Sequence, residues 1–237
     1  MNKNKCTFAS NNIKIFGHVV VDGLIYPDDD KIAAIAAWTT PKTKKQLKSF
    51  LGFTGYFRDM IDRYSTKAYC LTKLLGRTKP DKLVWTDEHQ GAFDTLRSAL
   101  MSRPMLRPPD IRKPFLIMAD SSQTNISVVL MQSSDTDEGV NHTVAYASRK
   151  LLDRETRYPT IEQELLAIVF ALLKFKHFIY GCEIKIYSDH RPLAYLNSLV
   201  KHSPRLARWY LILLDFDVST TYIKGKCQLA DCLTRVK

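Results

Sequence analysis

Apolar residues in the first hundred positions recur mainly at three- and four-residue spacing, which is typical of helices with one buried face. This pattern predicts helices over residues 31–38, 52–64, 68–75 and 88–101. Another helix is predicted to begin at Thr40-Pro41, with the threonine as its cap and the proline at its first position. A β-rich segment, residues 13–21, and a turn at Asp22-Gly23 precede these helices.

A proline-rich segment, residues 102–113, separates this helical part from a second part with a different pattern. The second part predicts strands over residues 114–120, 125–132, 143–148, 183–188 and 218–224. It predicts helices over residues 160–178, 192–199 and 205–214, and a short one from Gln228. The order β-β-β-α-β-α-β-α predicts an α/β fold, a mixed five-stranded sheet with flanking helices, preceded by the mainly helical region.

Four carboxylates stand where the pattern predicts buried elements or their ends: Asp120, Glu164, Asp189 and Asp231. Asp120 and Asp189 end predicted strands, and Glu164 lies in a predicted helix that is apolar nearly all round. Carboxylates on buried elements are costly unless they are paired, protonated or bound to a cation. The sequence shows no dedicated basic partner for this group, so a divalent cation such as Mg²⁺ or Mn²⁺ explains it best.

Helical periodicity alone leaves the choice between Glu162 and Glu164 open. Glu164 shares a stripe with Ile168, and Glu162 shares one with Leu166, so either carboxylate could face the interior.

The charge balance favours a polyanionic partner. The formal net charge is +11, from 35 Lys and Arg against 24 Asp and Glu. Four lysines crowd the helix expected after Thr40: Lys42, Lys44, Lys45 and Lys48. They fit a solvated helix face as well as a helix laid along a nucleic-acid backbone.

Cysteine use and hydropathy indicate the environment. The five cysteines are scattered and form no Cys-x-x-Cys pair, which favours reduced thiols in a cytoplasmic or nuclear protein. No apolar run is long enough to span a membrane, and the first residues do not resemble a signal peptide, so we expect no membrane partner.

Several motifs resemble those of gypsy-type LTR-retrotransposon reverse transcriptases. Residues 145–151 read AYASRKL, residues 158–169 YPTIEQELLAIV, residues 187–193 YSDHRPL and residues 230–235 ADCLTR. These four segments are similar to ribonuclease H motifs of that family. Residues 41–56, PKTKKQLKSFLGFTGY, are similar to its thumb. The similar segments follow the family's order over essentially the whole chain.

The resemblance implies the C-terminal part of such an enzyme. Residues 1–35 would be the truncated end of the palm and the entry to the thumb, residues 36–105 the thumb and connection, and residues 106–237 a ribonuclease H-like domain. This domain would cut the RNA strand of an RNA/DNA hybrid with two Mg²⁺ or Mn²⁺ ions. The rest of a retroelement polyprotein would be a further partner.

The resemblance also implies a role for each acid. Asp120 would bridge both metal ions, Glu164 and Asp189 would complete one site, and Asp231 would bind the other ion. The family's register selects Glu164 over Glu162. Tyr222 is the candidate for positioning water or releasing product, although a place in the core or in strand pairing fits it equally well.

The polymerase motif of the family, Tyr-x-Asp-Asp, does not occur in this chain, so we do not expect it to polymerise DNA. Three hypotheses follow. The chain is a metal-dependent ribonuclease H, or a relic that binds nucleic acid without cutting it, or an inert fragment of a decayed element. The second would arise if the turn after Asp120 or the short loop before Asp231 were misformed.

Overall fold

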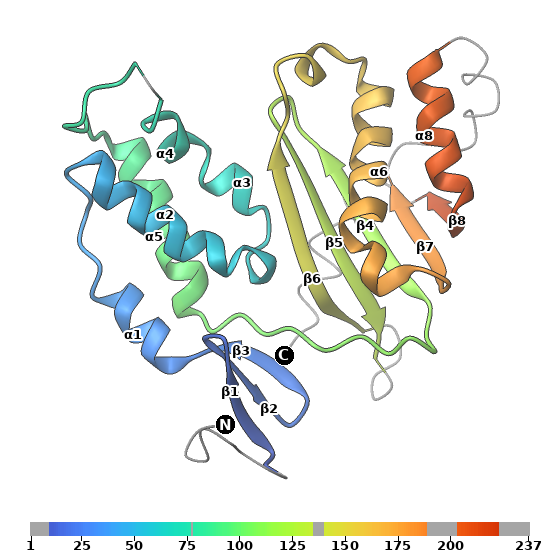
Figure 1. The fold of residues 1–237 in the computed structure, drawn as a ribbon, viewed down its shortest axis with the longest axis horizontal. Helices are drawn as coiled ribbons and strands as arrows, with labels where there is room; N and C mark the ends of the chain where they lie inside the picture. Colours follow the sequence, from blue (N-terminus) through green and yellow to red (C-terminus); the bar gives the residue numbers. More distant parts are fainter. Residues whose placement is uncertain (1–9, 77, 135–139, 189–202, 223–237) are drawn as a thin grey trace, which may run out of the picture. The chain divides into compact units, whose positions relative to one another are not determined.

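The computed structural model describes residues 10–76, 78–134, 140–188 and 203–222. The chain divides into two compact units (Figure 1). The first, here called the N-terminal unit, consists of residues 1–61 and 70–108. The second, the sheet unit, consists of residues 62–69 and 109–237. The three-part division predicted from the sequence stays a prediction.

The N-terminal unit begins with an antiparallel sheet of three short strands in the order β1-β2-β3, Asn12–Ile15, His18–Val21 and Leu24–Pro27. The turn at Asp22-Gly23 is confirmed, with φ values of 49° and 74°. A second turn, Phe16-Gly17, has φ values of 48° and 75° and divides the β-rich segment into two strands. Positive φ at both central residues is the mark of tight hairpin turns.

The described helices of this unit are α1, Asp29–Ala36, α2, Lys44–Tyr56, and α5, Asp87–Met101, with a 3₁₀ turn, Arg58–Met60. The short α4, Tyr69–Lys73, belongs to it except for its first residue. The predicted start at Thr40-Pro41 is wrong. Thr43 caps α2 because its side chain accepts a hydrogen bond from the Gln46 amide, while the Gln46 side chain accepts one from the Thr43 amide. This capping box lies three residues beyond the predicted cap and outweighs the preference for proline in a first turn.

The helix predicted over residues 52–64 is interrupted. α2 ends at Tyr56, and the next α-helix is the short α3, Tyr64–Lys67. Arg63, which precedes α3, has φ of 50° and ψ of 38°, a left-handed conformation that no continuous α-helix can contain. The core of the N-terminal unit joins α2 and α5, where the rings of Phe50 and Phe93 lie 4.5 Å apart.

The sheet unit contains the predicted mixed five-stranded sheet, in the order β6-β5-β4-β7-β8. Its strands are β4, Phe115–Ser121, β5, Asn125–Ser133, β6, Asn141–Lys150, β7, Glu183–Ser188, and β8, Asp217–Tyr222. β4, β5 and β6 are antiparallel neighbours, whereas β7 is parallel to both β4 and β8. The central strand β4 therefore joins the antiparallel half of the sheet to the parallel half.

One face of this sheet is covered by the 20-residue helix α6, Thr160–Ile179, beside which α8, Pro204–Leu214, is drawn in Figure 1. The apolar residues of α6 and the sheet form the main core, which includes Phe115, Ile117, Leu172 and Phe175. α6 is buried around most of its circumference, as its pattern predicts, because it packs against both the sheet and α8. The predicted helices over residues 192–199 and from Gln228 lie outside the described residues.

The opposite face carries a smaller apolar cluster, formed by Leu116, Met118, Val129 and Met131. The short α3 packs against β5 and β6, and the Ser65 amide donates a hydrogen bond of 2.8 Å to Ser148 Oγ on β6. Among the helices of the described ranges, none is both long and apolar enough to cross a membrane.

Candidate active site

Asp120 lies near the end of β4, in the middle of the sheet. In the register of the sheet, Asp120 pairs with Ser127 on β5. The pairing of β4 with β7 ends two residues earlier, where Met118 lies opposite Tyr187. The Asp120 side chain is 43% exposed, so a cation from solvent can reach its carboxylate. It forms an ion pair with Arg63, whose Nη2 lies 3.2 Å from Asp120 Oδ2.

Glu164 lies in the first part of α6 and is buried, with 5% of its surface exposed. Its Oε1 accepts a hydrogen bond of 3.0 Å from Ser121 Oγ, and Ser121 directly follows Asp120. Glu162 instead forms an ion pair with Arg205 on the flank of α6 that faces α8. The structure thus turns Glu164, and not Glu162, toward the strand that carries Asp120.

The two acids approach the end of β4 from opposite faces of the sheet. Ala119 belongs to the core under α6 and Met118 to the smaller cluster on the other face. Because successive side chains of a strand alternate, Asp120 points to the face of Met118 and Ser121 to the face of α6. The contacts of Asp120 with Arg63 and of Ser121 with Glu164 agree with this alternation.

The other predicted site residues are described only in part. Asp189 and Asp231 lie outside the described residues. Asp189 follows Ser188, the last residue of β7, and Ser188 pairs in register with Tyr222, the last residue of β8. The backbone of Tyr222 therefore ends β8 beside the end of β7, at the edge where parallel strands present their carboxyl ends.

The donor chemistry of the described acids fits a divalent metal ion. Asp120 and Glu164 offer carboxylate oxygens, which are the ligands that Mg²⁺ and Mn²⁺ prefer. No cluster of three or more His, Cys, Asp or Glu is found in the described ranges, from which two of the four predicted ligands are missing. Asp120 and Glu164 are thus the described half of the predicted site.

Arg63 is the site residue that sequence reasoning missed, and it corrects the expectation that the acids have no basic partner. It lies within a segment whose apolar spacing predicts a helix, and no local signal shows which strand it reaches. The contact exists because residues 62–69 pack against the sheet. It is a tertiary contact between positions 57 residues apart, 63 and 120, which periodicity cannot predict.

The surface between residues 62–69 and the sheet is poorly solvated. Burial lowers the pKa of Lys67, whose ammonium donates a hydrogen bond of 2.7 Å to the Asp62 carbonyl oxygen. Burial also raises the pKa of Tyr146 on β6, and the nearby Asp62 charge acts in the same direction. The Arg63–Asp120 pair is less buried than these two groups, since its side chains are 39% and 43% exposed.

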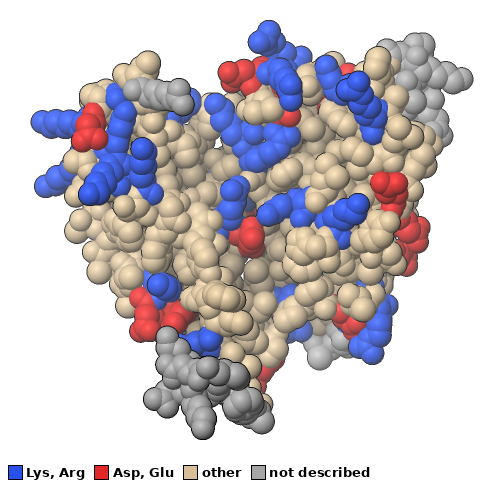
Figure 2. Space-filling view, in the orientation of Figure 1, with Lys and Arg blue, Asp and Glu red and all other residues tan. Residues whose placement is uncertain are grey.

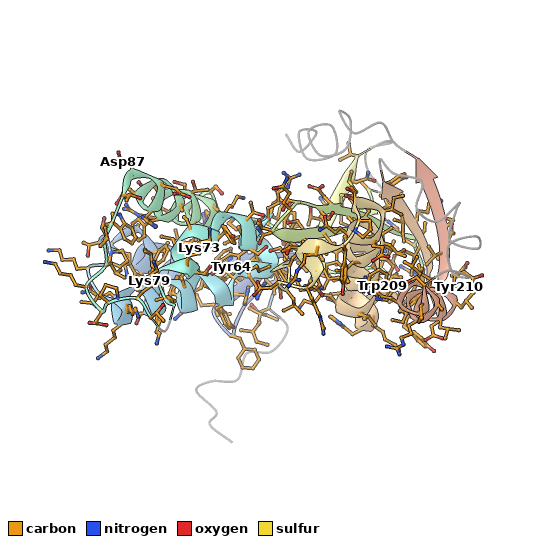
Figure 3. All side chains as sticks on the ribbon, turned by 90° about the horizontal axis from the view of Figure 1, so that it is seen from above. Tyr64, Lys73, Lys79, Asp87, Trp209 and Tyr210 are labelled. Carbon is orange, nitrogen blue, oxygen red and sulfur yellow. The ribbon has the colours of Figure 1, made fainter. Side chains whose placement is uncertain are left out.

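A groove of about 590 Å³ lies where the 3₁₀ turn η3, Glu155–Arg157, meets the first turns of α6 and α8. The Arg205 guanidinium lies 3.8 Å from the centre of the Tyr158 ring, and the Trp209 ring lies 6.2 Å from that ring. Trp209 lies on the α6 side of α8 and Tyr210 on its outer side (Figure 3). Two further arginines, Arg154 and Arg208, line the groove.

The acid of this groove is already neutralised. Glu155 is almost fully buried and forms an ion pair with Arg149 on β6. Burial, the largest influence, opposes ionisation, but hydrogen bonds from Arg149 and from the Leu152 amide outweigh it and leave the pKa of Glu155 lowered. Arg205 is also ion-paired, with Glu162, so Arg154 and Arg208 give the groove its positive charge. Figure 2 shows Lys and Arg gathered at this end of the sheet unit.

The four lysines predicted to contact nucleic acid do not share one environment. Lys42, Lys45 and Lys48 are exposed. Lys44 is partly buried, and its ammonium donates hydrogen bonds to the carbonyl oxygens of Gly76 and Lys79, so it holds the loop after α4. Other exposed lysines of this unit are Lys73, Lys79 and Lys82, of which Figure 3 labels the first two.

Comparison with known proteins bears on these residues. Residues 110–216 match the family described as the RNase H-like domain found in reverse transcriptase. The chain is 37% identical over 238 residues to the retrovirus-related Pol polyprotein from transposon 297 of Drosophila melanogaster. This alignment covers 99% of this chain and 21% of the relative. It is 31% identical over 241 residues to the transposon Tf2-3 polyprotein of Schizosaccharomyces pombe, covering 100% of this chain and 18% of the relative. The chain spans about a fifth of the length of these relatives.

Solved structures share the fold. The foamy viral protease-reverse transcriptase in complex with double-stranded DNA aligns with a TM-score of 0.76 at 22% identity, over 91% of this chain and 45% of that one. The same viral protein in complex with an RNA/DNA hybrid aligns with a TM-score of 0.75 at 21% identity, over 91% of this chain and 29% of that one. At this level of identity the likeness establishes the architecture.

Proposed function

We propose that this chain, whose residues 110–216 belong to the RNase H-like domains found in reverse transcriptases, is a metal-dependent ribonuclease that cuts the RNA strand of RNA/DNA hybrids. One observation carries the proposal. Ser121, next to Asp120 on the central strand, fixes Glu164 of the buried helix, so that acids from two elements reach the same end of the sheet. The backbone ends of β7 and β8 lie at that end as well.

In this proposal, Asp120 and Glu164 hold two Mg²⁺ or Mn²⁺ ions together with Asp189 and Asp231. When bound, such ions activate a water molecule and stabilise the leaving oxygen of a phosphodiester. Ser121 keeps the Glu164 carboxylate oriented by donating its hydroxyl hydrogen. Tyr222, whose backbone ends β8, is our candidate for positioning water or product.

Two basic surfaces support a hybrid as the substrate. On the sheet unit, Arg154, Arg205 and Arg208 line the groove beside Tyr158 and Trp209. Arginines bind phosphates, and aromatic rings and guanidinium planes stack on exposed bases. On the N-terminal unit, Lys42, Lys45 and Lys48 are exposed, so they can contact a phosphate backbone.

The wider setting belongs to the same proposal. We infer that the chain is the C-terminal part of a gypsy-type reverse transcriptase, that it acts within a Pol polyprotein, and that its parent carries the polymerase acids which this sequence lacks. A reducing cytoplasmic or nuclear location agrees with the unpaired Cys70 and Cys182 among the described cysteines.

Cleavage of an end-labelled RNA/DNA hybrid tests the proposal. With Mg²⁺ or Mn²⁺ we expect loss of the RNA strand, and with a chelator we expect none. Asp120→Asn and Glu164→Gln should each reduce the rate by more than the roughly 10- to 100-fold that is typical of outer-shell partners of a metal site. Glu183→Gln is the matched control, since this carboxylate is 51% exposed and lies at the opposite end of β7.

The Arg63 contact favours one competing function, nucleic-acid binding without cleavage, because a guanidinium already neutralises Asp120. Tight binding of the hybrid, no cleavage at any concentration of Mg²⁺ or Mn²⁺, and no effect of Asp120→Asn would establish that alternative. Equal cleavage by wild type and Asp120→Asn would instead contradict the assigned metal site.

A further inference from the structure

Arg63 lies outside residues 110–216, which match the RNase H-like domain, whereas its partner Asp120 lies inside them. Arg63 Nη2 lies 3.2 Å from Asp120 Oδ2, and both side chains belong to the sheet unit. The two residues also line one small surface pocket together with Asp62 and Met118. The guanidinium therefore touches Asp120 on the face of the sheet opposite to α6.

Arg63 is held there by its neighbours and not by its own conformational preference. Its backbone is left-handed, with φ of 50°, which is uncommon for any residue except glycine. Its Nε is buried and has no hydrogen-bond partner within the described part of the chain. On its C-terminal side, Tyr64 is buried and the Ser65 amide is bonded to Ser148 Oγ.

A divalent cation bound to the Asp120 carboxylate would lie close to the Arg63 guanidinium, which is 3.2 Å from Oδ2. The two groups carry like charge, so they compete for this carboxylate. The existing pair is weak enough to be displaced, since the Arg63 side chain is 39% exposed and the Asp120 side chain is 43% exposed. Water screens such pairs, whereas a divalent ion held by several carboxylates is bound more firmly.

We propose that Arg63 is a positioning residue that competes with the divalent cation for Asp120. Without the cation, Arg63 neutralises Asp120 and holds its carboxylate on the face away from Glu164. Binding of a cation would displace the guanidinium, and the Asp120 carboxylate would then be available as a ligand. The inference rests on the metal site of the proposed function, and it adds a group that sets the affinity of this site.

Isothermal titration of the full chain with Mn²⁺, in the absence of nucleic acid, tests the inference. Arg63→Gln should bind Mn²⁺ about fivefold more tightly than wild type, which corresponds to loss of one half-exposed ion pair. Arg63→Met, which keeps part of the alkyl chain, should behave in the same way and serves if the first variant folds poorly. A role of Arg63 in folding alone would not tighten metal binding.

Arg112→Gln is the matched control for the loss of one positive charge. Arg112 lies in the same unit, is 86% exposed and pairs with Asp110, so its removal should leave Mn²⁺ affinity unchanged. Equal or weaker binding by Arg63→Gln, or equal tightening by Arg112→Gln, would overturn the inference. If Asp120→Asn nevertheless weakens binding, the metal site of the proposed function stands. No Mn²⁺ binding by any variant would overturn both.

Discussion

The two faces of the five-stranded sheet differ in how much apolar surface they bury. The face under α6 carries the main core, with Phe115, Ile117 and Phe175 fully buried. The opposite face carries only a small cluster, which includes Met118 and Met131, and is partly covered by the short segment 62–69. The first face therefore supplies most of the apolar burial, and the second combines modest burial with charged groups.

The two described acids of the candidate site lie on these two different faces. Glu164 belongs to the well-packed face, where burial and Ser121 fix its carboxylate. Asp120 points to the loosely covered face, where it is half-exposed and shares its carboxylate with Arg63. One acid of the predicted metal site is thus buried and hydrogen-bonded, and the other is half-exposed and ion-paired.

The largest effect should come from removing a large side chain on the α6 face. Phe175→Ala should lower the free energy of unfolding by about 3–5 kcal/mol, because the cavity lies in a close-packed core. Met118→Ala should cost less, about 2 kcal/mol, because segment 62–69 can move toward the gap. Urea unfolding measures both values.

Leu173→Ala is the control for this comparison, since Leu173 lies on the same helix as Phe175 but is 53% exposed. It should change the free energy of unfolding by less than about 0.5 kcal/mol. A cost for Met118→Ala equal to that for Phe175→Ala would mean that the two faces are equally tightly packed.

A smaller effect should follow from breaking the ion pair between Glu155, the first residue of η3, and Arg149. Glu155→Gln should lower the free energy of unfolding at pH 7 by about 1–3 kcal/mol, because it leaves Arg149 without its charged partner. The folded-state pKa of Glu155 is lowered, so its contribution is complete above its unfolded pKa of roughly 4.3 and is lost as the pH falls through the folded value.

Urea unfolding at a series of pH values measures this difference. The gap between wild type and Glu155→Gln should be constant near neutral pH and should close below about pH 4. Glu183→Gln, which removes an exposed carboxylate 3.5 Å from Lys185, should show almost no gap at any pH. A Glu155→Gln gap that widened toward acid would contradict the sign of the pKa shift.

The smallest effect should come from the attachment of segment 62–69. Ser148→Ala removes the acceptor of the Ser65 amide and should cost about 1 kcal/mol. Amide hydrogen exchange should accelerate at Ser65 while the amides of α6 stay protected. Ser133→Ala, at the exposed end of β5, should leave the Ser65 amide unchanged. Unaltered exchange at Ser65 in Ser148→Ala would mean that other contacts hold the segment.

Much of the fold could be predicted from the sequence, because period and composition reflect burial directly. The helix predicted over residues 160–178 corresponds to α6, Thr160–Ile179, and the strand predicted over residues 183–188 corresponds to β7. Errors arose where local signals compete. Thr40-Pro41 imitates a helix start, but the capping box of Thr43 and Gln46 determines where α2 begins.

The candidate site could be predicted less completely. Periodicity could not decide whether Glu162 or Glu164 faces the interior. In the structure Glu164 is the buried one and accepts a hydrogen bond from Ser121, and its role as a metal ligand stays a prediction. The contact of Arg63 with Asp120 depends on tertiary packing of a segment that looks like a continuous helix in the sequence. Roles for Asp189, Asp231 and Tyr222 stay predictions.

The path of residues 62–69 has a consequence for modularity. The chain leaves the N-terminal unit after residue 61, contributes this short segment to the sheet unit, and returns at residue 70 before its final crossing near residue 108. The sheet unit is therefore discontinuous in sequence, and no single cut separates the two units intact. A fragment that begins at Pro109 would lack part of the cover of Met118 and Val129. If evolution exchanged the sheet unit as one continuous segment of chain, residues 62–69 would be left behind.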